Sequence, residues 1–364
     1  MRVLLVRLGA MGDIVHALPV AAALRQRFPF ARIDWVVDAR YAALLDLVPA
    51  IDGRIVVAAR DQAPAGAGRA PGSPGRDGVA DGPTGDRARR TFSAGLGWLR
   101  LVRALRRERY EVALDLQGLV KSAVVARASG ARRVIGFGRP WLREPLAARF
   151  YTERTAVARG GHVVDKNLAL LSALGIGTAA RVFPLAAGDM RPVEEMRRLH
   201  PEAARGFVLL NPGAAWPNKR WPPERFGALA AIVRRRHGLP SAVLWGPGEE
   251  ELAALVVDES GGAAFAAPAT RLPGLLGLAR SARLIVSGDT GPLHLAAAAG
   301  TPAVAVFGPT NPERNGPWHP ADLTVSRYDT CDCHYRRQCR RGRPCIAEIE
   351  VDEVARAVDL RLAT

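Results

Sequence analysis

The chain has 364 residues, enough for two ordinary domains, and 48% of them are hydrophobic, which excludes a wholly disordered protein. The formal charge of +16 indicates either an arginine-rich genome or an acidic partner: nucleic acid, an anionic membrane or a phosphorylated substrate. Gly300 and Pro302 interrupt the longest apolar run, so no membrane span is predicted. The N-terminus has strand–turn–helix patterning and does not resemble a signal peptide, which predicts a cytoplasmic protein.

The N-terminal half alternates apolar strands with amphipathic helices, the pattern of a parallel sheet covered by helices. Strands are predicted at 2–8, 33–37, 54–57, 111–116 and 134–137. Helices are predicted at 14–28, 41–48, 93–109, 144–151 and 162–174. Residues 60–90 are mostly Gly, Pro, Ala, Asp and Arg, and we expect a disordered insertion because they cannot bury enough surface to become ordered.

A second unit of the same kind follows a connector at 175–188. Strands are predicted at 206–210 and 241–245, with two more inside 285–312, and helices at 223–236, 272–282 and 351–362. The fold class is therefore α/β, with two Rossmann-like domains facing each other across a cleft. Their predicted limits are 1–180 and 181–350, followed by a C-terminal helix at 351–364.

The stretch from Ile285 to Pro312 contains the clearest binding signal. Its first strand ends in the turn Ser-Gly-Asp-Thr-Gly-Pro, residues 287–292, before a helix of small residues. Such a turn offers free amides and a helix dipole to an anion, most often a phosphate. In an open α/β sheet, ligands lie outside the carboxyl ends of the strands, where this turn is expected.

Five segments together resemble the lipopolysaccharide heptosyltransferases of the inverting glycosyltransferase family 9. They are RVLLVRLGAMGDIVHALP, DLQGLVKSA, NPGAAWPNKRWPPERF, WGPGEEE and SGDTGPLHLAAAAGTPAVAVFGPTNP. The resemblance covers nearly the whole chain outside 60–90 and the cysteine segment. The GMGD-type turn and QGLVKSA look closer to heptosyltransferase I than to heptosyltransferase II.

The resemblance implies a GT-B fold and a specific reaction. The C-terminal domain would bind ADP-L-glycero-D-manno-heptose, and the N-terminal domain would bind the acceptor, the Kdo of lipid A. The resemblance implies no cofactor and no metal in catalysis. That agrees with the anion turn, because amides, a dipole and Lys219 could neutralise a diphosphate without Mg²⁺.

Two residues are predicted to carry the chemistry. Asp13 matches the catalytic Asp of the family and would be the general base that deprotonates the acceptor hydroxyl. From the residues alone, Asp13 could equally cap the first helix. Lys219, flanked by two tryptophans, would hold the diphosphate, with a solvated surface lysine as the alternative.

The other donor-site residues follow from the turns and from the resemblance. The predicted donor-binding set is Gly213, Ala214, Ala215, Lys219, Glu249, Thr270, Asp289, Thr290, Gly291, Pro292 and His294. Family members often carry Thr or Ser where this chain has Ala214 and Ala215, so side-chain hydrogen bonds to phosphate are lost there. Glu249 could accept from ribose or adenine or merely start a helix, and His294 could be a packed core histidine. Thr270 enters by alignment alone.

The acceptor-side candidates are Arg7, Gly12, Arg60, Gln117 and Lys121. The cationic ones would face the Kdo carboxylates and lipid A phosphates. The helix around Arg100 is basic: it either packs on the sheet as an ordinary surface helix or touches an anionic membrane. The expected location is cytoplasmic, peripheral on the cytoplasmic face of the inner membrane.

All four cysteines lie in one segment: Cys331, Cys333, Cys339 and Cys345. Arginines separate them, and the segment is interpreted as a reduced basic loop, with a structural zinc site as the alternative. Two other functions stay open. One is a related transferase with another nucleotide sugar or another inner-core acceptor, of heptosyltransferase II or III type. The other is a nucleic-acid or zinc-binding module, although no aromatic stacking platform is present and no nucleic acid partner is expected.

Overall fold

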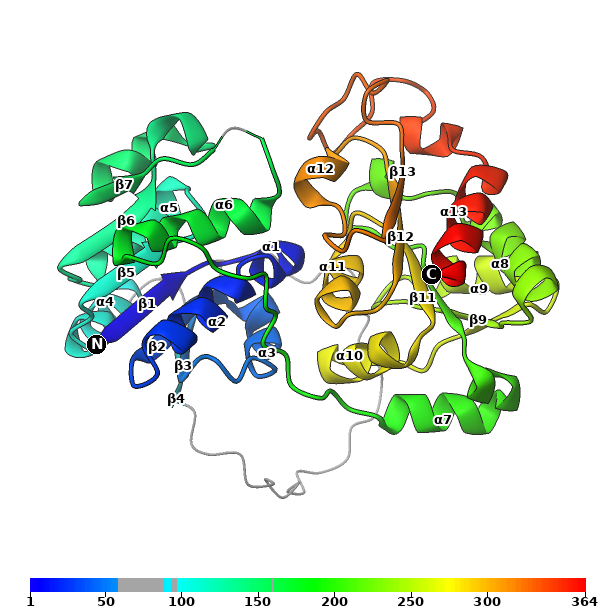
Figure 1. Cartoon of the computed structure of the whole chain (residues 1–364), viewed down its shortest axis with the longest axis horizontal. Coiled ribbons are helices and arrows are strands. Elements are labelled where there is room, and N and C mark those ends of the chain that lie inside the picture. Colours follow the sequence, from blue (N-terminus) through cyan, green and yellow to red (C-terminus); the bar gives the residue numbers. More distant parts are fainter. Residues whose placement is uncertain (58–87, 93–96, 159) are drawn as a thin grey trace. The chain divides into compact units, whose positions relative to one another are not determined.

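The computed structural model describes residues 1–57, 88–92, 97–158 and 160–364 (Figure 1). Their contacts divide them into two units. The first unit comprises Met1–Gly9, Val20–Val157 and Ala169–Ala179, and the second comprises Ala10–Pro19, Ala158–Leu168 and Ala180–Thr364. The domain limits expected from the sequence are linear, whereas Ala10–Pro19 and Ala158–Leu168 make most of their contacts in the second unit.

The first unit contains a parallel sheet of seven described strands in the order β4-β3-β2-β1-β5-β6-β7. The central strand is a run of Val and Leu at positions 3–6 that is fully buried, as both faces of a parallel strand require. The strands are β1 Arg2–Val6, β2 Arg32–Asp38, β3 Gly53–Val57, β4 Ala88–Phe92, β5 Val112–Asp115, β6 Arg133–Phe137 and β7 Glu153–Thr155.

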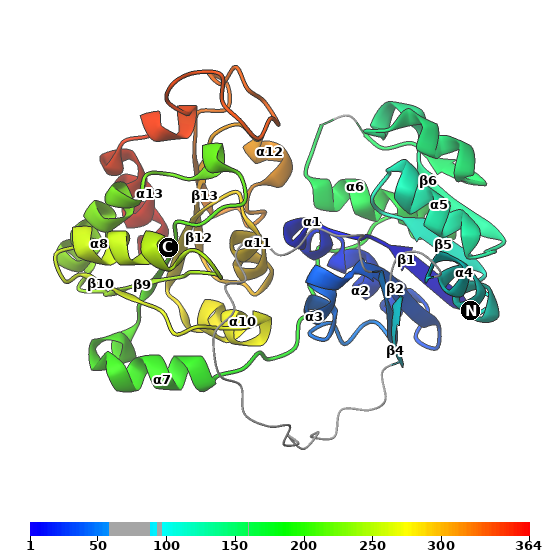
Figure 2. The same ribbon diagram turned by 180° about the vertical axis from the view of Figure 1, so that it is seen from behind.

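Helices follow most of these strands in the chain (Figure 2), and the first and the last of these helices make most of their contacts in the second unit. They are α1 Met11–Val15, α2 Leu18–Arg27, α3 Ala42–Leu45, α4 Gly97–Arg107, α5 Val120–Ala128 and α6 Val163–Ala169. Short 3₁₀ helices occur at Ala39–Tyr41, Arg139–Trp141, Pro145–Phe150 and Leu170–Leu174.

Several predicted elements of this half differ from the structure. The helix predicted at 162–174 is α6 followed by the 3₁₀ helix at Leu170–Leu174. Residues 93–96 of the helix predicted at 93–109 lie outside the described residues. The helix predicted at 14–28 is two helices, α1 and α2, because Pro19 has no amide to donate to the carbonyl four residues earlier. The segment predicted as a helix at 144–151 is a 3₁₀ turn that starts at Pro145. Of the predicted insertion, residues 58–87 lie outside the described residues, and its end belongs to strand β4, which pairs with β3.

The second unit contains a parallel sheet of six described strands in the order β10-β9-β8-β11-β12-β13. The strands are β8 Val208–Asn211, β9 Ser241–Val243, β10 Ala264–Ala266, β11 Leu284–Gly288, β12 Ala303–Phe307 and β13 Leu323–Ser326. The helices are α7 Arg191–Leu199, α8 Pro223–His237, α9 Glu250–Glu259, α10 Leu272–Ser281, α11 Gly291–Ala298, α12 Pro312–Asn315 and α13 Val351–Ala363, with 3₁₀ turns at Pro201–Arg205, Pro217–Lys219 and Cys345–Glu348.

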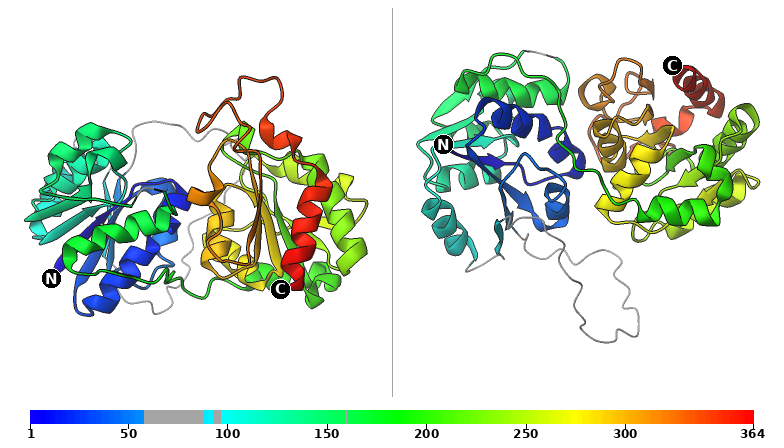
Figure 3. Two further views of the ribbon diagram at one scale, coloured as in Figure 1. Left: turned by 45° about the horizontal axis from the view of Figure 1, so that its top comes forward. Right: turned by 60° about the horizontal axis from the view of Figure 1, so that its bottom comes forward.

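Helices cover both faces of this sheet (Figure 3). An apolar core lies between the sheet and the helices on each face. One joins the strands to α8, α9 and α13, and Trp221 and Phe226 are its largest side chains. The other joins them to α7, α10 and α11. The carboxyl ends of the strands are thus held by a sheet buried on both faces, which gives the loops that follow them a rigid base. No helix among the described residues has the length and apolar character to cross a membrane.

Candidate functional site

Strands β8 and β11 are neighbours, and their register pairs Asn211 with Ser287. Both residues end an apolar run, so two polar loops start side by side at the carboxyl edge of the sheet. The amide nitrogen of the Asn211 side chain donates to the hydroxyls of Ser287 at 3.0 Å and Thr290 at 3.1 Å and to the carbonyl of Gly213 at 3.2 Å. One buried side chain therefore ties the 211–220 loop to the 287–292 turn.

Thr290 occupies the N-cap position of α11 without capping it. Its hydroxyl lies 2.9 Å from that of Ser287 and also accepts from Asn211, so it is held away from the first-turn amides. Those amides sit at the positive end of the α11 dipole. This is the local arrangement that favours an anion, and it includes the predicted residues Thr290, Gly291 and Pro292.

Lys219 meets Asp289 at this turn. The Lys219 ammonium lies 2.5 Å from Oδ2 of Asp289, and both side chains are largely buried. His294 of α11 approaches the same carboxylate from the other side, with Nε2 at 3.0 Å from Oδ1. Because an ionised carboxylate only accepts hydrogen bonds, Nε2 carries the proton. Three predicted donor-site residues thus form one connected cluster.

The charge state of Asp289 follows from these neighbours. Burial alone would raise its pKa, but the hydrogen bond from His294 and the charge of Lys219 outweigh burial and hold the pKa well below the usual range of a carboxyl group. Asp289 is therefore ionised, and it neutralises Lys219. Trp216 contributes a further contact, because the Lys219 nitrogen lies 4.6 Å from its ring centroid.

Glu249 and Gly213 lie in contact. The Glu249 carboxylate accepts from the Gly246 amide at 3.1 Å, and a Cβ at Gly213 would lie only 2.3 Å from its Oε2. A side chain at position 213 would therefore require the Glu249 carboxylate to move from this place. Ala214 is buried and its carbonyl accepts from Arg220, whereas Ala215 is exposed. Thr270 lies in the loop before α10 and is half-buried, beside Gly274.

Asp13 lies in α1, and its Oδ2 accepts from the Ala10 amide at 3.1 Å. The alternative expected from the sequence, a role at the helix start, is thus also present. Helix α1 packs against α11 within the second unit, because Gly12 has no side chain: a Cβ there would lie 2.3 Å from the ring of His294. The rings of His16 and His294 are 4.3 Å apart. The helix that carries Asp13 therefore lies on the helix that starts at the anion turn.

The acceptor-side candidates are placed differently. Arg7 is buried, and its guanidinium donates to the carbonyl of Leu116 at 2.5 Å. Gln117 accepts from the Leu8 amide at 2.9 Å through its side chain. Lys121 is exposed at the start of α5. Burial would raise the pKa of Asp38, but hydrogen bonds and charge from Arg40, with a smaller effect of Lys121, lower it. Arg60 lies outside the described residues.

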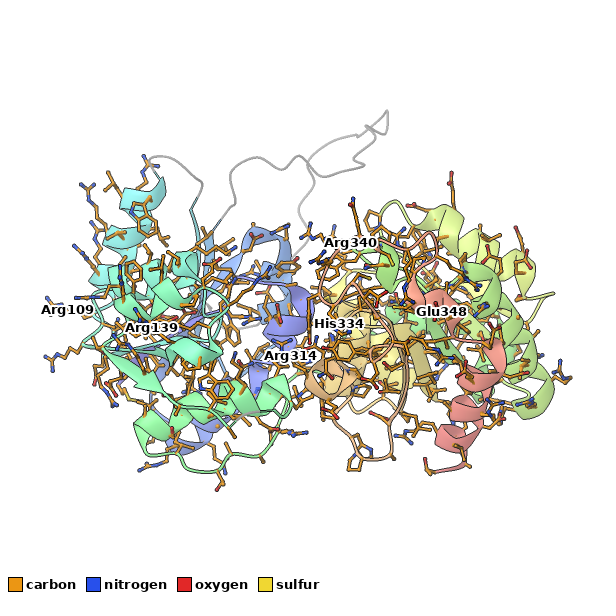
Figure 4. All side chains as sticks on the ribbon, turned by 90° about the horizontal axis from the view of Figure 1, so that it is seen from above. Arg109, Arg139, Arg314, His334, Arg340 and Glu348 are labelled. Carbon is orange, nitrogen blue, oxygen red and sulfur yellow. The ribbon has the colours of Figure 1, made fainter. Side chains whose placement is uncertain are left out.

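The cysteine segment folds back on itself over the second unit, and His334 and Arg340, labelled in Figure 4, lie on it. All four cysteines are free, and three of them are buried together. The sulfurs of Cys331 and Cys333 are 3.5 Å apart, and burial raises the pKa of both thiols. Among the residues that the structure describes, no group of three or more His, Cys, Asp or Glu side chains could hold a metal ion. The zinc alternative thus finds no support here, and the thiols pack as small apolar groups.

Asn211 was not among the predicted site residues, and Ser287 was predicted only as the first residue of the anion turn. Asn211 is 5% exposed and Ser287 is fully buried, yet both carry polar side chains that connect the two loops of the site. The available signal was a single polar residue at the carboxyl end of an otherwise apolar strand, as in Val-Leu-Leu-Asn.

Comparisons with known proteins agree on one family. Residues 98–343 match the glycosyltransferase family 9 (heptosyltransferase) profile. Lipopolysaccharide heptosyltransferase 1 of Pseudomonas aeruginosa is 30% identical over 93% of this chain and 87% of its own length. Lipopolysaccharide heptosyltransferase 3 of Escherichia coli is 23% identical over 96% of this chain and 95% of its own.

A solved structure gives the same result for the fold. The structure of E. coli heptosyltransferase WaaC with ADP-2-deoxy-2-fluoro heptose has a TM-score of 0.67 and 22% identity, and the match covers 99% of both chains. At that identity the likeness concerns the fold alone. It confirms the predicted GT-B fold, which consists of two Rossmann-like units.

Proposed function

This chain belongs to glycosyltransferase family 9, the heptosyltransferase family, and we propose that it moves heptose from ADP-L-glycero-D-manno-heptose to the Kdo of lipid A. The product would be an inner-core intermediate of lipopolysaccharide. The similarity to lipopolysaccharide heptosyltransferase 1 over most of the chain supports this acceptor. The donor is supported by E. coli WaaC, a relative of the same fold that was solved with an ADP-heptose analogue.

The single observation that carries the proposal is the cluster of Lys219, Asp289 and His294 at the start of α11. A departing diphosphate needs a cation and amide donors in place before it leaves. Lys219 offers the first, and the uncapped first turn of α11 offers the second. The ion pair with Asp289 keeps Lys219 in position before the donor binds. An arriving diphosphate would then compete with Asp289 for the ammonium group.

A single general base is sufficient for the transfer. The acceptor hydroxyl oxygen attacks the anomeric carbon from the face opposite ADP, the bond from that carbon to the diphosphate oxygen breaks, and ADP leaves with the electron pair. The hydroxyl proton goes to the carboxylate of Asp13. The packing of α1 against α11 supports this assignment, because it brings the segment of Asp13 to the helix that begins at the diphosphate turn.

Transfer with product analysis tests the proposal. The purified chain is incubated with ADP-heptose and Kdo–lipid A, and the product is identified by mass and by the configuration of its new linkage. We expect one added heptose and an inverted anomeric carbon. If only UDP-sugars stabilise the protein in a thermal-shift screen, and ADP-heptose gives no product, the heptose assignment is wrong.

A second acceptor is the alternative. The relative named heptosyltransferase 3 matches nearly the whole chain, so a heptosyl-bearing inner core is the competing substrate class. Parallel assays with acceptors that already carry one or two heptoses separate the two: preference for either over Kdo–lipid A would place this chain with the later transferases. We also propose that the enzyme works at the cytoplasmic face of the inner membrane, where a lipid acceptor of this kind resides.

A further inference from the structure

Helix α4 exposes a basic face that the proposed chemistry does not use. We define this face as Trp98, Leu99, Arg100, Arg103, Arg106 and Arg107. The helix buries Gly97, Leu101 and Leu105 against the first unit. All members of the basic face are exposed, with Leu99 at 57% and Trp98 at 41%. We propose that this face docks on an anionic phospholipid bilayer.

Charge is the first argument. Helix α4, with the sequence GWLRLVRALRR, contains no acidic residue. The first acid after it, Glu108, is buried and paired with Arg2 at 2.7 Å, so it cannot neutralise the outer side of the helix. Four guanidinium groups within about two turns therefore repel one another until a partner supplies negative charge. A bilayer with anionic headgroups supplies it as a surface, without demanding a particular geometry.

The position of Leu99 is the second argument. Leu99 and Arg103 are four residues apart and hence on one side of the helix, and Arg106 and Arg107 follow on the same side. A largely exposed leucine among arginines is the pattern of a helix that lies in a membrane interface, with apolar groups inserted and cationic heads at the phosphates. A nucleic acid backbone would leave the leucine without a partner.

Elements near α4 also expose arginine and apolar side chains. Helix α4 packs against α5, and α5 packs against the 3₁₀ turn at Pro145–Phe150. This turn exposes Leu146 at 56%, and Arg143 and Arg149 beside it are also exposed. Figure 4 labels Arg109 and Arg139 on the same unit, and both are exposed as well. Exposed Glu144 lies among these groups, but arginines outnumber it, and exposed arginines on several elements favour an extended anionic partner over a small anion.

The inference rests on the proposed function in one respect: a lipid acceptor explains why the protein would bind a membrane. The residues of the basic face lie outside the proposed site. The test of the inference therefore omits the acceptor. The full chain is sedimented with vesicles of phosphatidylcholine alone or mixed with phosphatidylglycerol. We expect binding to the mixed vesicles only, and loss of that binding at about 1 M salt, where screening is nearly complete.

Variants assign the binding to the face. R100A/R103A should weaken the partition by about 25-fold, since each arginine near an anionic surface contributes about 1 kcal/mol, or about fivefold. L99A should weaken the binding that remains at intermediate salt. The matched controls are R197A/R198A and L199A on α7, which change equally exposed residues of the same types and should bind as the unchanged protein does. Thermal unfolding checks that all variants are folded.

Three results would overturn the proposal: equal binding to both kinds of vesicle, an equal loss in the α7 controls, or DNA displacing the protein from the anionic vesicles. The two proposals also fail separately. Transfer to a deacylated, water-soluble acceptor should be unchanged in R100A/R103A, whereas transfer to a vesicle-embedded acceptor should fall. If the unchanged protein does not act on the soluble acceptor either, the proposed reaction is wrong and the vesicle result still stands.

Discussion

The ammonium group of Lys219 and the carboxylate of Asp289 form a largely buried ion pair, 2.5 Å from nitrogen to oxygen, although 70 residues separate them in the chain. The pair keeps a cation at the turn before α11 without leaving an uncompensated charge. A buried pair of this kind is costly to break from one side only. Single and double substitutions of the pair should therefore differ in their effect on stability.

Removal of Lys219 should separate catalysis from stability. Lys219→Met should lower kcat by about 10²–10³-fold, the usual effect of losing one preorganised stabilising group. It should also destabilise the fold, because Asp289 keeps only His294 as a partner. The double variant K219M/D289N removes both charges, so urea denaturation should show recovered stability while transfer stays lost. Arg235→Met on the exposed side of α8 serves as the control. Full activity in Lys219→Met would remove the lysine from the mechanism.

Replacement of Asp13 should remove the general base and leave the binding of the sugar donor unchanged. Asp13→Asn keeps an oxygen to accept from the Ala10 amide, so the start of α1 should survive. We expect transfer to fall by about 10²–10⁴-fold, the range attributed to a general base. Calorimetric affinity for ADP-heptose should be unchanged. Turnover at the ordinary rate would show that Asp13 serves only the helix.

His162 should make stability depend on pH. Its Nε2 donates to the carbonyl of Gly316 at 2.9 Å, and its Nδ1 accepts from the Val164 amide at the start of α6. Burial lowers its pKa from 6.5 to about 4, although the hydrogen bond to Gly316 acts in the opposite direction. Arg181 and His294 add smaller lowering effects, and Asp165 adds a small raising effect. The unfolded chain therefore binds this proton at higher pH than the folded chain does. Stability should be fully present above pH ~6.5 and fall by about 3 kcal/mol as pH drops to ~4.

A variant isolates the contribution of this histidine. His162→Asn keeps an acceptor for the Val164 amide but has no group that titrates. In this variant the slope of the urea midpoint against pH should be smaller, because the contribution of His162 is gone. His319→Asn, at an exposed position, should leave the slope as it was. If His162→Asn has the original slope, the acid sensitivity belongs to other groups.

We expect Asp115 to stabilise the fold and to take no part in the reaction. It is fully buried, and its oxygens accept from the amides of Gln117 and Gly118 and from the hydroxyls of Ser122 and Tyr151. Asp115→Ala would leave three donors without an acceptor, since the Ser122 hydroxyl can still donate to the carbonyl of Leu119. This should cost at least about 3 kcal/mol of unfolding free energy. Ser122→Ala, which removes one donor, should cost about 1 kcal/mol. A melting temperature unchanged in Asp115→Ala would contradict this account.

Local patterns in the sequence were enough for most strands of both sheets. Apolar runs such as residues 3–6 and 284–286 predict buried strands, and the glycines and the proline of residues 287–292 predict the turn. The ion pair of Lys219 with Asp289 and the bridge from Asn211 to Thr290 could not be predicted in this way. They depend on β8 lying next to β11, and strand order is a property of the whole sheet.

Other differences have equally local causes. Strands β7, β10 and β13 are short or half-buried, so their apolar signal is weak. Residues 191–199 are too polar to stand out as a helix by apolar content, yet Val193 and Met196, three apart, anchor α7 to its core. The contact of Gly12 with His294 could not be predicted either, because a glycine in a sequence does not say which ring fills the space beside it.

Trp216 lies beside Lys219, so its fluorescence can report on the site. A cation 4.6 Å from an indole ring perturbs its emission, and Arg337 lies 5.9 Å from the same ring. Any anion that draws Lys219 away from Asp289 also changes the field at Trp216. Emission difference spectra between the unchanged protein and Trp216→Phe would therefore follow occupancy of the turn in real time, without a label and without turnover.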